Sequence, residues 1–123
     1  MQQILIYVVL SFILGTLIKI ITDIPKKRAK TSVYRYGGFP SVHALTVTSL
    51  ATSVFLVEQV SSAFIVSLIL GILVVRDINL RAKIDAIGSK TIKNYVPIAH
   101  TTKEIIGGVV LGVLIPVVLH LVL

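Results

Sequence analysis

The chain has 123 residues, of which 55% are hydrophobic and only 14% are charged. Soluble domains carry about 25% charged residues, so this composition excludes an ordinary soluble domain and indicates a membrane protein. The absence of cysteine excludes disulfides, a thiolate nucleophile and a cysteine-based zinc site. In a chain this apolar, the net charge of +7 favours anionic lipid headgroups over nucleic acid as partners.

Four apolar segments predict an all-α, four-helix integral membrane protein that forms a single domain over residues 1–123. The expected spans are residues 4–22, 40–58, 61–76 and 102–123. The first and last match the roughly 20 residues that cross a bilayer. The third is short, and we expect its helix to extend past Arg76.

The second segment is less apolar than the first and is rich in small residues. Small side chains let helix backbones approach closely in a membrane, so we expect this helix to be the one most buried by protein. In the last segment, Gly108 and Gly112 form a G-x-x-x-G pattern that favours the same close packing. The glycines of this helix are also compatible with a homo-oligomer.

The placement of positive charge predicts the orientation in the membrane. All 12 lysines and arginines lie in, or at the edge of, residues 19–35 and 76–103. With four spans these two segments fall on the same side, and the positive-inside rule places that side in the cytoplasm. Both termini are then expected outside.

The segment Tyr36–Ala44 joins the first basic segment to the second helix. Its two glycines permit close approach of a ligand, and Pro40 suits the first turn of a helix. Ser41 and His43 would then lie beside the N–H groups of a helix N-terminus, which favour an anion. The alternative is structural, with Ser41 as a helix cap and His43 packed between helices.

A second histidine, His100, precedes the last helix and is expected on the same membrane face as His43. Glu104 follows His100 by about one turn and could orient its imidazole. The alternative for Glu104 is a capping box with Thr101. Two histidines beside a basic rim favour phosphoryl transfer, in which one attacks phosphorus and the other protonates the leaving oxygen. This chemistry requires no metal or cofactor.

The two motifs resemble the divergent branch of the type 2 phosphatidic acid phosphatase superfamily, which also includes the vanadium haloperoxidases. That branch shows G-G-M-P-S-S-H-S before one helix and H-T-x-x-E-x-x-x-G at the last. The similar segments here are Gly37–His43 and His100–Gly108, and the resemblance extends from about Leu17 to Val118. It implies a metal-independent phosphatase of a lipid phosphate or diphosphate, such as a polyprenyl phosphate or phosphatidic acid, at the cytoplasmic leaflet.

The resemblance also implies a role for each candidate residue. His100 would be the nucleophile that forms a phosphohistidine, Glu104 would assist it, and His43 would be the general acid. The residues expected to bind phosphate are Ser41, Arg35, Arg28, Arg81 and Lys19. Arg28 and Arg35 have the spacing of the superfamily's first basic motif, in which a lysine stands at the position of Arg28.

Other interpretations stay open. Lys19 near the end of a span is typical of a lysine that extends to the membrane interface. Asp77 and Asp85 could hold a divalent metal for phosphotransfer. Val42 replaces a glycine of the superfamily pattern, and Asn94 replaces an arginine for which Arg81 could substitute. These departures leave a second function open: a non-enzymatic membrane protein of the same fold that binds anionic lipids or serves as a scaffold or transporter subunit.

Overall fold

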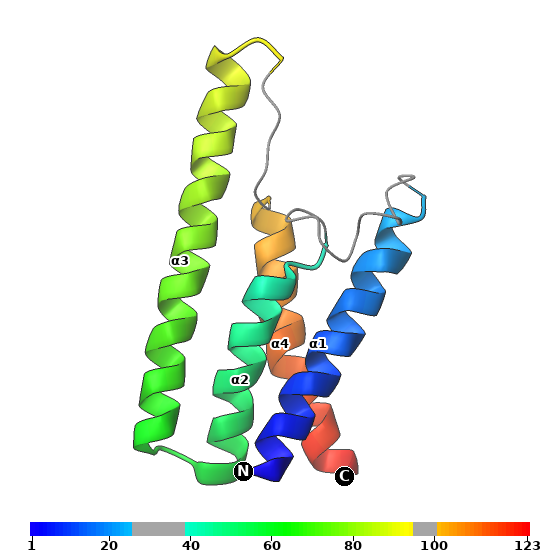
Figure 1. The fold of residues 1–123 in the computed structure, drawn as a ribbon, viewed down its shortest axis with the longest axis vertical. Helices are drawn as coiled ribbons and strands as arrows, with labels where there is room; N and C mark the ends of the chain where they lie inside the picture. The colour runs from blue at the N-terminus through cyan, green and yellow to red at the C-terminus, as the bar shows by residue number, and fades with distance from the viewer. Residues whose placement is uncertain (26–38, 95–100) are drawn as a thin grey trace.

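The computed structural model describes residues 1–25, 39–94 and 101–123. These residues form four α-helices, and no strand occurs among them. The helices are α1 (Gln2–Asp23), α2 (Val42–Glu58), α3 (Ser62–Thr91) and α4 (Thr102–Val122). They lie side by side in a bundle (Figure 1). The predicted all-α, four-helix fold is therefore confirmed.

Helix α2 is the central helix of the bundle. It packs against α1, α3 and α4, whereas α1 and α3 do not contact each other. Its buried residues are Ala44, Leu45, Ser49, Ala51, Ser53 and Val54, and most of these are alanine or serine. The hydroxyls of Ser49 and Ser53 donate to carbonyl oxygens about one turn earlier in α2, so they are satisfied without a partner on another helix. Because these side chains are small, the neighbouring helices pack closely against α2 and bury it, as predicted.

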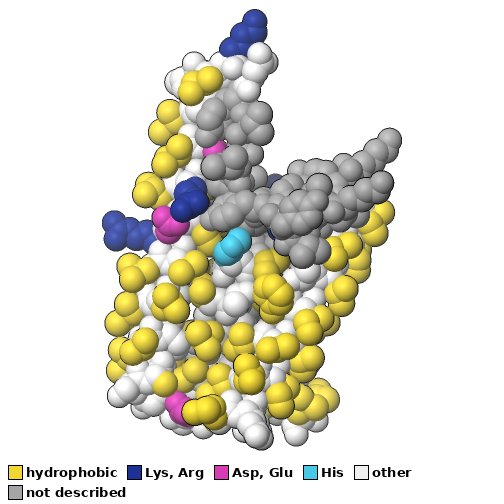
Figure 2. All heavy atoms as spheres, in the orientation of Figure 1, with side chains coloured by type: hydrophobic (Ala, Val, Ile, Leu, Met, Phe, Trp, Pro, Cys, Tyr) yellow, Lys and Arg dark blue, Asp and Glu magenta, His cyan; other side chains and the backbone are white. Residues whose placement is uncertain are grey.

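In the part of the chain that the structure describes, three helices are long and apolar enough to cross a membrane: α1, α3 and α4. Helix α2 is also apolar, but its 17 residues make it shorter. At about 1.5 Å per residue it extends about 25 Å, slightly less than a hydrocarbon core of about 30 Å. Hydrophobic side chains cover much of the outside of the bundle (Figure 2), where lipid rather than water would surround them. The chain is an integral membrane protein.

The third predicted span, residues 61–76, covers only the first part of a longer helix, because α3 continues through Arg76 to Thr91. The added stretch contains no proline. It also contains an ion pair one turn apart, in which Arg81 Nε lies 3.1 Å from Asp77 Oδ2. Helix α3 is thus about 45 Å long at about 1.5 Å per residue, and it projects beyond the other helices (Figure 1). The expected extension past Arg76 is confirmed.

The ends of the helices divide into two groups. Both termini and the turn between α2 and α3 lie at one end of the bundle (Figure 1). The helix ends that flank residues 26–38 and 95–100 point toward the opposite end, which we call the loop end. This arrangement agrees with four crossings of the membrane. The side of the membrane that the loop end faces stays a prediction.

Helices α2 and α4 approach closely because glycines of α4 face α2. A Cβ atom at Gly108 would collide with the backbone oxygen of Ser41, and one at Gly112 would lie 2.8 Å from the backbone oxygen of Leu45. Only glycine permits this approach. The predicted close packing of the G-x-x-x-G pattern is confirmed within the chain. A homo-oligomer would therefore need another surface.

We predict that Gly108→Ala destabilises the protein by about 1–3 kcal/mol, the usual cost of overpacking a well-packed interface. The matched control is Gly71→Ala on α3, because a Cβ atom there would meet its nearest neighbour, the Val47 backbone oxygen, at an ordinary 3.7 Å. Thermal unfolding followed by circular dichroism in detergent measures both variants. An equal effect of the two substitutions would contradict the packing argument.

Candidate functional site

Helix α2 begins directly after Ser41, which caps it. The backbone of Ser41 is extended, and its Oγ accepts a hydrogen bond from the Ala44 N–H at 3.3 Å. The predicted start of the helix at Pro40 is therefore wrong: Pro40 precedes the cap, and its bond to Phe39 is cis. The structural interpretation of Ser41 as a cap is confirmed. Its phosphate-binding role stays a prediction.

The residues before α2 are held between α1 and α4. The Ser41 N–H donates to the backbone carbonyl of Glu104 at 3.0 Å. On the other side, the Thr22 hydroxyl of α1 donates to the carbonyl of Phe39 at 2.7 Å. The Phe39 ring occupies the space that a side chain at Gly107 would need. Two segments far apart in the sequence are thus joined, and the Ser41 N–H serves this contact rather than an anion.

His43 lies in the first turn of α2 and is exposed, so the interpretation of a histidine packed between helices is wrong. Its side chain borders a hollow of about 390 Å³ between α2 and α3. Asp77 and Arg81 of α3 line the same hollow and form the ion pair described above. The structure therefore brings two predicted site residues, His43 and Arg81, to one hollow.

Glu104 forms the predicted capping box at the start of α4. Its Oε1 accepts a hydrogen bond from the Thr101 N–H at 2.9 Å, and the Thr101 hydroxyl accepts one from the Glu104 N–H at 3.4 Å. The structural interpretation of Glu104 is thus confirmed. A second role beside His100 stays a prediction, because His100 lies outside the described residues.

Lys19 is buried by protein, with only 4% of its surface exposed. One turn later, Asp23 is fully buried as well. Lys19 therefore faces the bundle and does not extend along the lipid-facing surface, which excludes the interfacial interpretation. Both residues lie near the end of α1, where Thr22 contacts Phe39. The buried side of α1 thus places charged groups near Phe39, a residue of the first motif.

Some predicted site residues cannot be placed, and others were missed. Arg28 and Arg35, like His100, lie outside the described residues. Asp23 and Thr22 were not predicted, although a carboxylate four residues after a lysine at the end of an apolar helix is a recognisable signal. The contact of Thr22 with Phe39 has no such signal, because it joins segments separated by the basic loop.

The two aspartates proposed for a metal do not form a shared site. Asp77 and Asp85 are eight residues apart on α3, which is about 12 Å along a helix. Asp77 is exposed and pairs with Arg81, whereas Asp85 is buried. Among the described residues, no three histidine, aspartate or glutamate side chains converge as metal ligands. This geometry does not support the alternative with a metal at these aspartates.

Comparison with known proteins agrees with this arrangement of motifs. Residues 1–115 match the family model described as the Divergent PAP2 family, where PAP2 denotes type 2 phosphatidic acid phosphatase. No curated protein and no solved structure matches the chain significantly. The matched region contains all four helices except the last turns of α4. The chain belongs to the Divergent PAP2 family.

Proposed function

We propose that the protein is a membrane phosphatase of a lipid phosphate or diphosphate that works through a phosphohistidine at His100. One observation carries the proposal: the Ser41 N–H donates to the Glu104 carbonyl. His43 follows Ser41 by two residues, and His100 precedes Glu104 by four. The hydrogen bond therefore supports a common site for the two motif histidines.

The proposed reaction has two steps. In the first, a neutral ring nitrogen of His100 attacks phosphorus, the bond to the lipid oxygen breaks, and His43 gives its proton to that oxygen. In the second, water attacks the phosphohistidine, gives a proton to His43 and releases inorganic phosphate as the P–N bond breaks. Glu104 orients His100 and stabilises its positive charge. The other product is a lipid alcohol, or a lipid monophosphate from a diphosphate.

Cations near the histidines would hold the phosphate oxygens as negative charge develops. Arg81 is the described residue that supports this role most directly, because it borders the same hollow as His43. Asp77 orients the Arg81 guanidinium through their ion pair. The rest of the proposed phosphate-binding set is Lys19, Ser41, Arg28 and Arg35.

We predict that the purified protein releases phosphate from at least one lipid phosphate in a panel assayed in detergent with EDTA. His100→Asn should reduce release to background. His43→Asn should reduce it by about 10²–10⁴-fold, the usual contribution of a general acid. The matched control is His120→Asn at the far end of α4, where Tyr7 Oη lies 3.1 Å from His120 Nδ1. It should retain activity.

Full activity of His100→Asn, or loss of wild-type activity on adding EDTA, would overturn the proposed mechanism.

Glu104 allows a finer test, because Glu104→Gln keeps a side-chain acceptor for the capping box but removes the carboxylate. We expect an unchanged unfolding temperature and lower turnover in this variant. Glu104→Ala should lose both turnover and about 1 kcal/mol of stability. Normal turnover in Glu104→Gln would leave Glu104 with its capping role alone.

The alternative is a non-enzymatic member of the same fold that binds anionic lipids or acts as a scaffold or transporter subunit. Asn94 favours it, since the superfamily has an arginine at this position. In this chain Asn94 is exposed and has a φ of 62°, a left-handed backbone that asparagine tolerates at the end of a helix. No release from any lipid by a folded protein would favour this alternative over the phosphatase.

We also propose that the loop end faces the cytoplasm, because the basic residues gather there. The chain lacks cysteine, so a single cysteine can report the accessible side. In spheroplasts of expressing bacteria, Val60→Cys in the exposed turn between α2 and α3 should react with a membrane-impermeant maleimide. Lys90→Cys near the end of α3 should react only after permeabilisation. The reverse pattern would place the proposed site outside.

A further inference from the structure

The hollow beside His43 is polar toward the loop end and apolar farther into the bundle. Its described lining consists of His43 of α2 and five residues of α3: Leu73, Val74, Asp77, Ile78 and Arg81. Leu73 precedes Arg81 by eight residues, which is about 12 Å along a helix. Because α3 runs toward the loop end, Leu73 lies deeper in the bundle than Arg81. The hollow therefore has the polarity of a phosphate that is attached to a hydrocarbon chain.

The apolar end of the hollow has a fixed inner wall and an open outer side. Ile78 is only 2% exposed and packs in the core with Ala44 of α2, and Val74 packs against the same cluster. Leu73, in contrast, is 55% exposed on the outside of the bundle, where lipid would surround it. A chain whose phosphate lies near Arg81 can thus pass Leu73 into the bilayer without opening the core.

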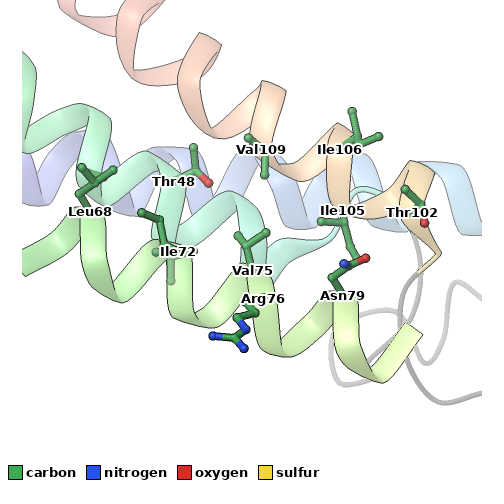
Figure 3. Close-up of a pocket in the computed structure, with 13 residues that line it drawn as sticks. Thr48, Leu68, Ile72, Val75, Arg76, Asn79, Thr102, Ile105, Ile106 and Val109 are labelled. Carbon is green, nitrogen blue, oxygen red and sulfur yellow. The ribbon is translucent and has the colours of Figure 1, made fainter. Parts of the chain in front are cut away.

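The groove between α3 and α4, on the other side of α3, lacks this polarity. Arg76 is the one cation among the described residues that line it, and the guanidinium of Arg76 is directed away from the groove (Figure 3). Ile105 lines the groove, whereas Ile78 lines the hollow, and both belong to one core cluster. The core therefore separates the two spaces, and the hollow is the one that combines a phosphate-binding group with apolar lining.

The apolar end of the hollow disfavours a polar linker between the phosphate and the chain. Phosphatidic acid carries ester groups at this position. The side chains of Leu73, Val74 and Ile78 offer no hydrogen-bond donor, and the backbone N–H groups within a helix are already bonded. Ester groups buried there would lose their hydrogen bonds to water without replacement. The volume of about 390 Å³ also lies near the lower limit of the range of about 300–1,000 Å³ typical of small-molecule sites.

We propose that the hollow beside His43 selects a substrate with one hydrocarbon chain joined directly to the phosphate oxygen, in preference to phosphatidic acid. Leu73 is the specificity-determining residue, because it contacts the first part of the chain. The inference rests on the proposed phosphatase function, which leaves both lipid classes open. The substrate enters laterally from the bilayer past Leu73, and its phosphate moves toward Arg81 at the loop end.

The test uses tryptophan fluorescence, because the chain contains no tryptophan. Leu73→Trp places a single reporter at the apolar end of the hollow, and the His100→Asn background prevents hydrolysis. The probe is an alkyl phosphate brominated near the phosphate, since bromine quenches tryptophan on contact, and the protein is held in phosphatidylcholine nanodiscs. The matched control is Ile72→Trp, at a neighbouring and similarly exposed residue that lines the α3–α4 groove instead (Figure 3).

Leu73→Trp should show quenching that saturates with the probe and is reversed by unbrominated alkyl phosphate. Ile72→Trp should show only the non-saturating quenching of probe dissolved in the bilayer. Phosphatidic acid should compete at least about tenfold more weakly than alkyl phosphate, because its ester groups would be left unpaired. Adding Arg81→Gln should weaken probe binding about tenfold through loss of a charge-assisted hydrogen bond. Lys83→Gln, exposed on α3 outside the hollow, should not weaken it.

A turnover measurement gives a second readout with His100 present. Leu73→Ala should raise the KM for the alkyl phosphate and leave kcat near the wild-type value, because Leu73 contacts the chain rather than the reacting atoms. Ile72→Ala should change neither quantity. A lower kcat with an unchanged KM in Leu73→Ala would contradict the assigned role.

Equal saturable quenching of Ile72→Trp, or none of Leu73→Trp, would overturn the placement of the chain. Equal competition by phosphatidic acid would overturn the selectivity. Failure of the phosphatase function has a different signature. In that case the wild type releases no phosphate, while the saturable quenching of Leu73→Trp and its dependence on Arg81 persist.

Discussion

The hydrogen bond from the Ser41 N–H to the Glu104 carbonyl joins the two motifs of this protein. Backbone groups buried in a membrane protein must find partners within the protein, because lipid offers none. The Ser41 N–H finds one on α4 at 3.0 Å only because α2 and α4 approach closely. That approach depends on Gly108, where any side chain would collide with the Ser41 backbone oxygen. The glycine that ends the second motif thus has a physical role in positioning the first.

Helices α3 and α1 contribute the other charged groups near the hydrogen bond between Ser41 and Glu104. The long extension of α3 places Asp77 and Arg81 beside His43, where the three residues line one hollow between α2 and α3. Helix α1 contributes Lys19 on its buried side. Most of the remaining surface of the bundle is apolar. The polar groups near the loop end therefore support a site for an amphiphilic substrate whose charge lies near the membrane surface.

Much of this arrangement could be predicted from sequence because it depends on local patterns. Apolar runs predict helices, Gly108 and Gly112 predict close packing, and Thr101 with Glu104 predicts a capping box. Contacts between distant segments carry no such pattern. The burial of Lys19 depends on how α1 packs in the bundle, and the start of α2 depends on Ser41 acting as a cap rather than on Pro40. The end of α3 at Thr91 could not be located from the apolar pattern, because the apolar run stops at Val75 and the residues that continue the helix are mostly polar.

The central claim is that catalysis passes through a phosphohistidine at residue 100. The most direct measurement is acid-free trapping of the wild-type protein during turnover of a lipid phosphate labelled on phosphorus, followed by peptide mapping. The account predicts a base-stable, acid-labile phosphate on the peptide that contains His100, and none in His100→Asn. Turnover accompanied by a phosphate on a carboxylate, or turnover that persists in His100→Asn, would contradict it.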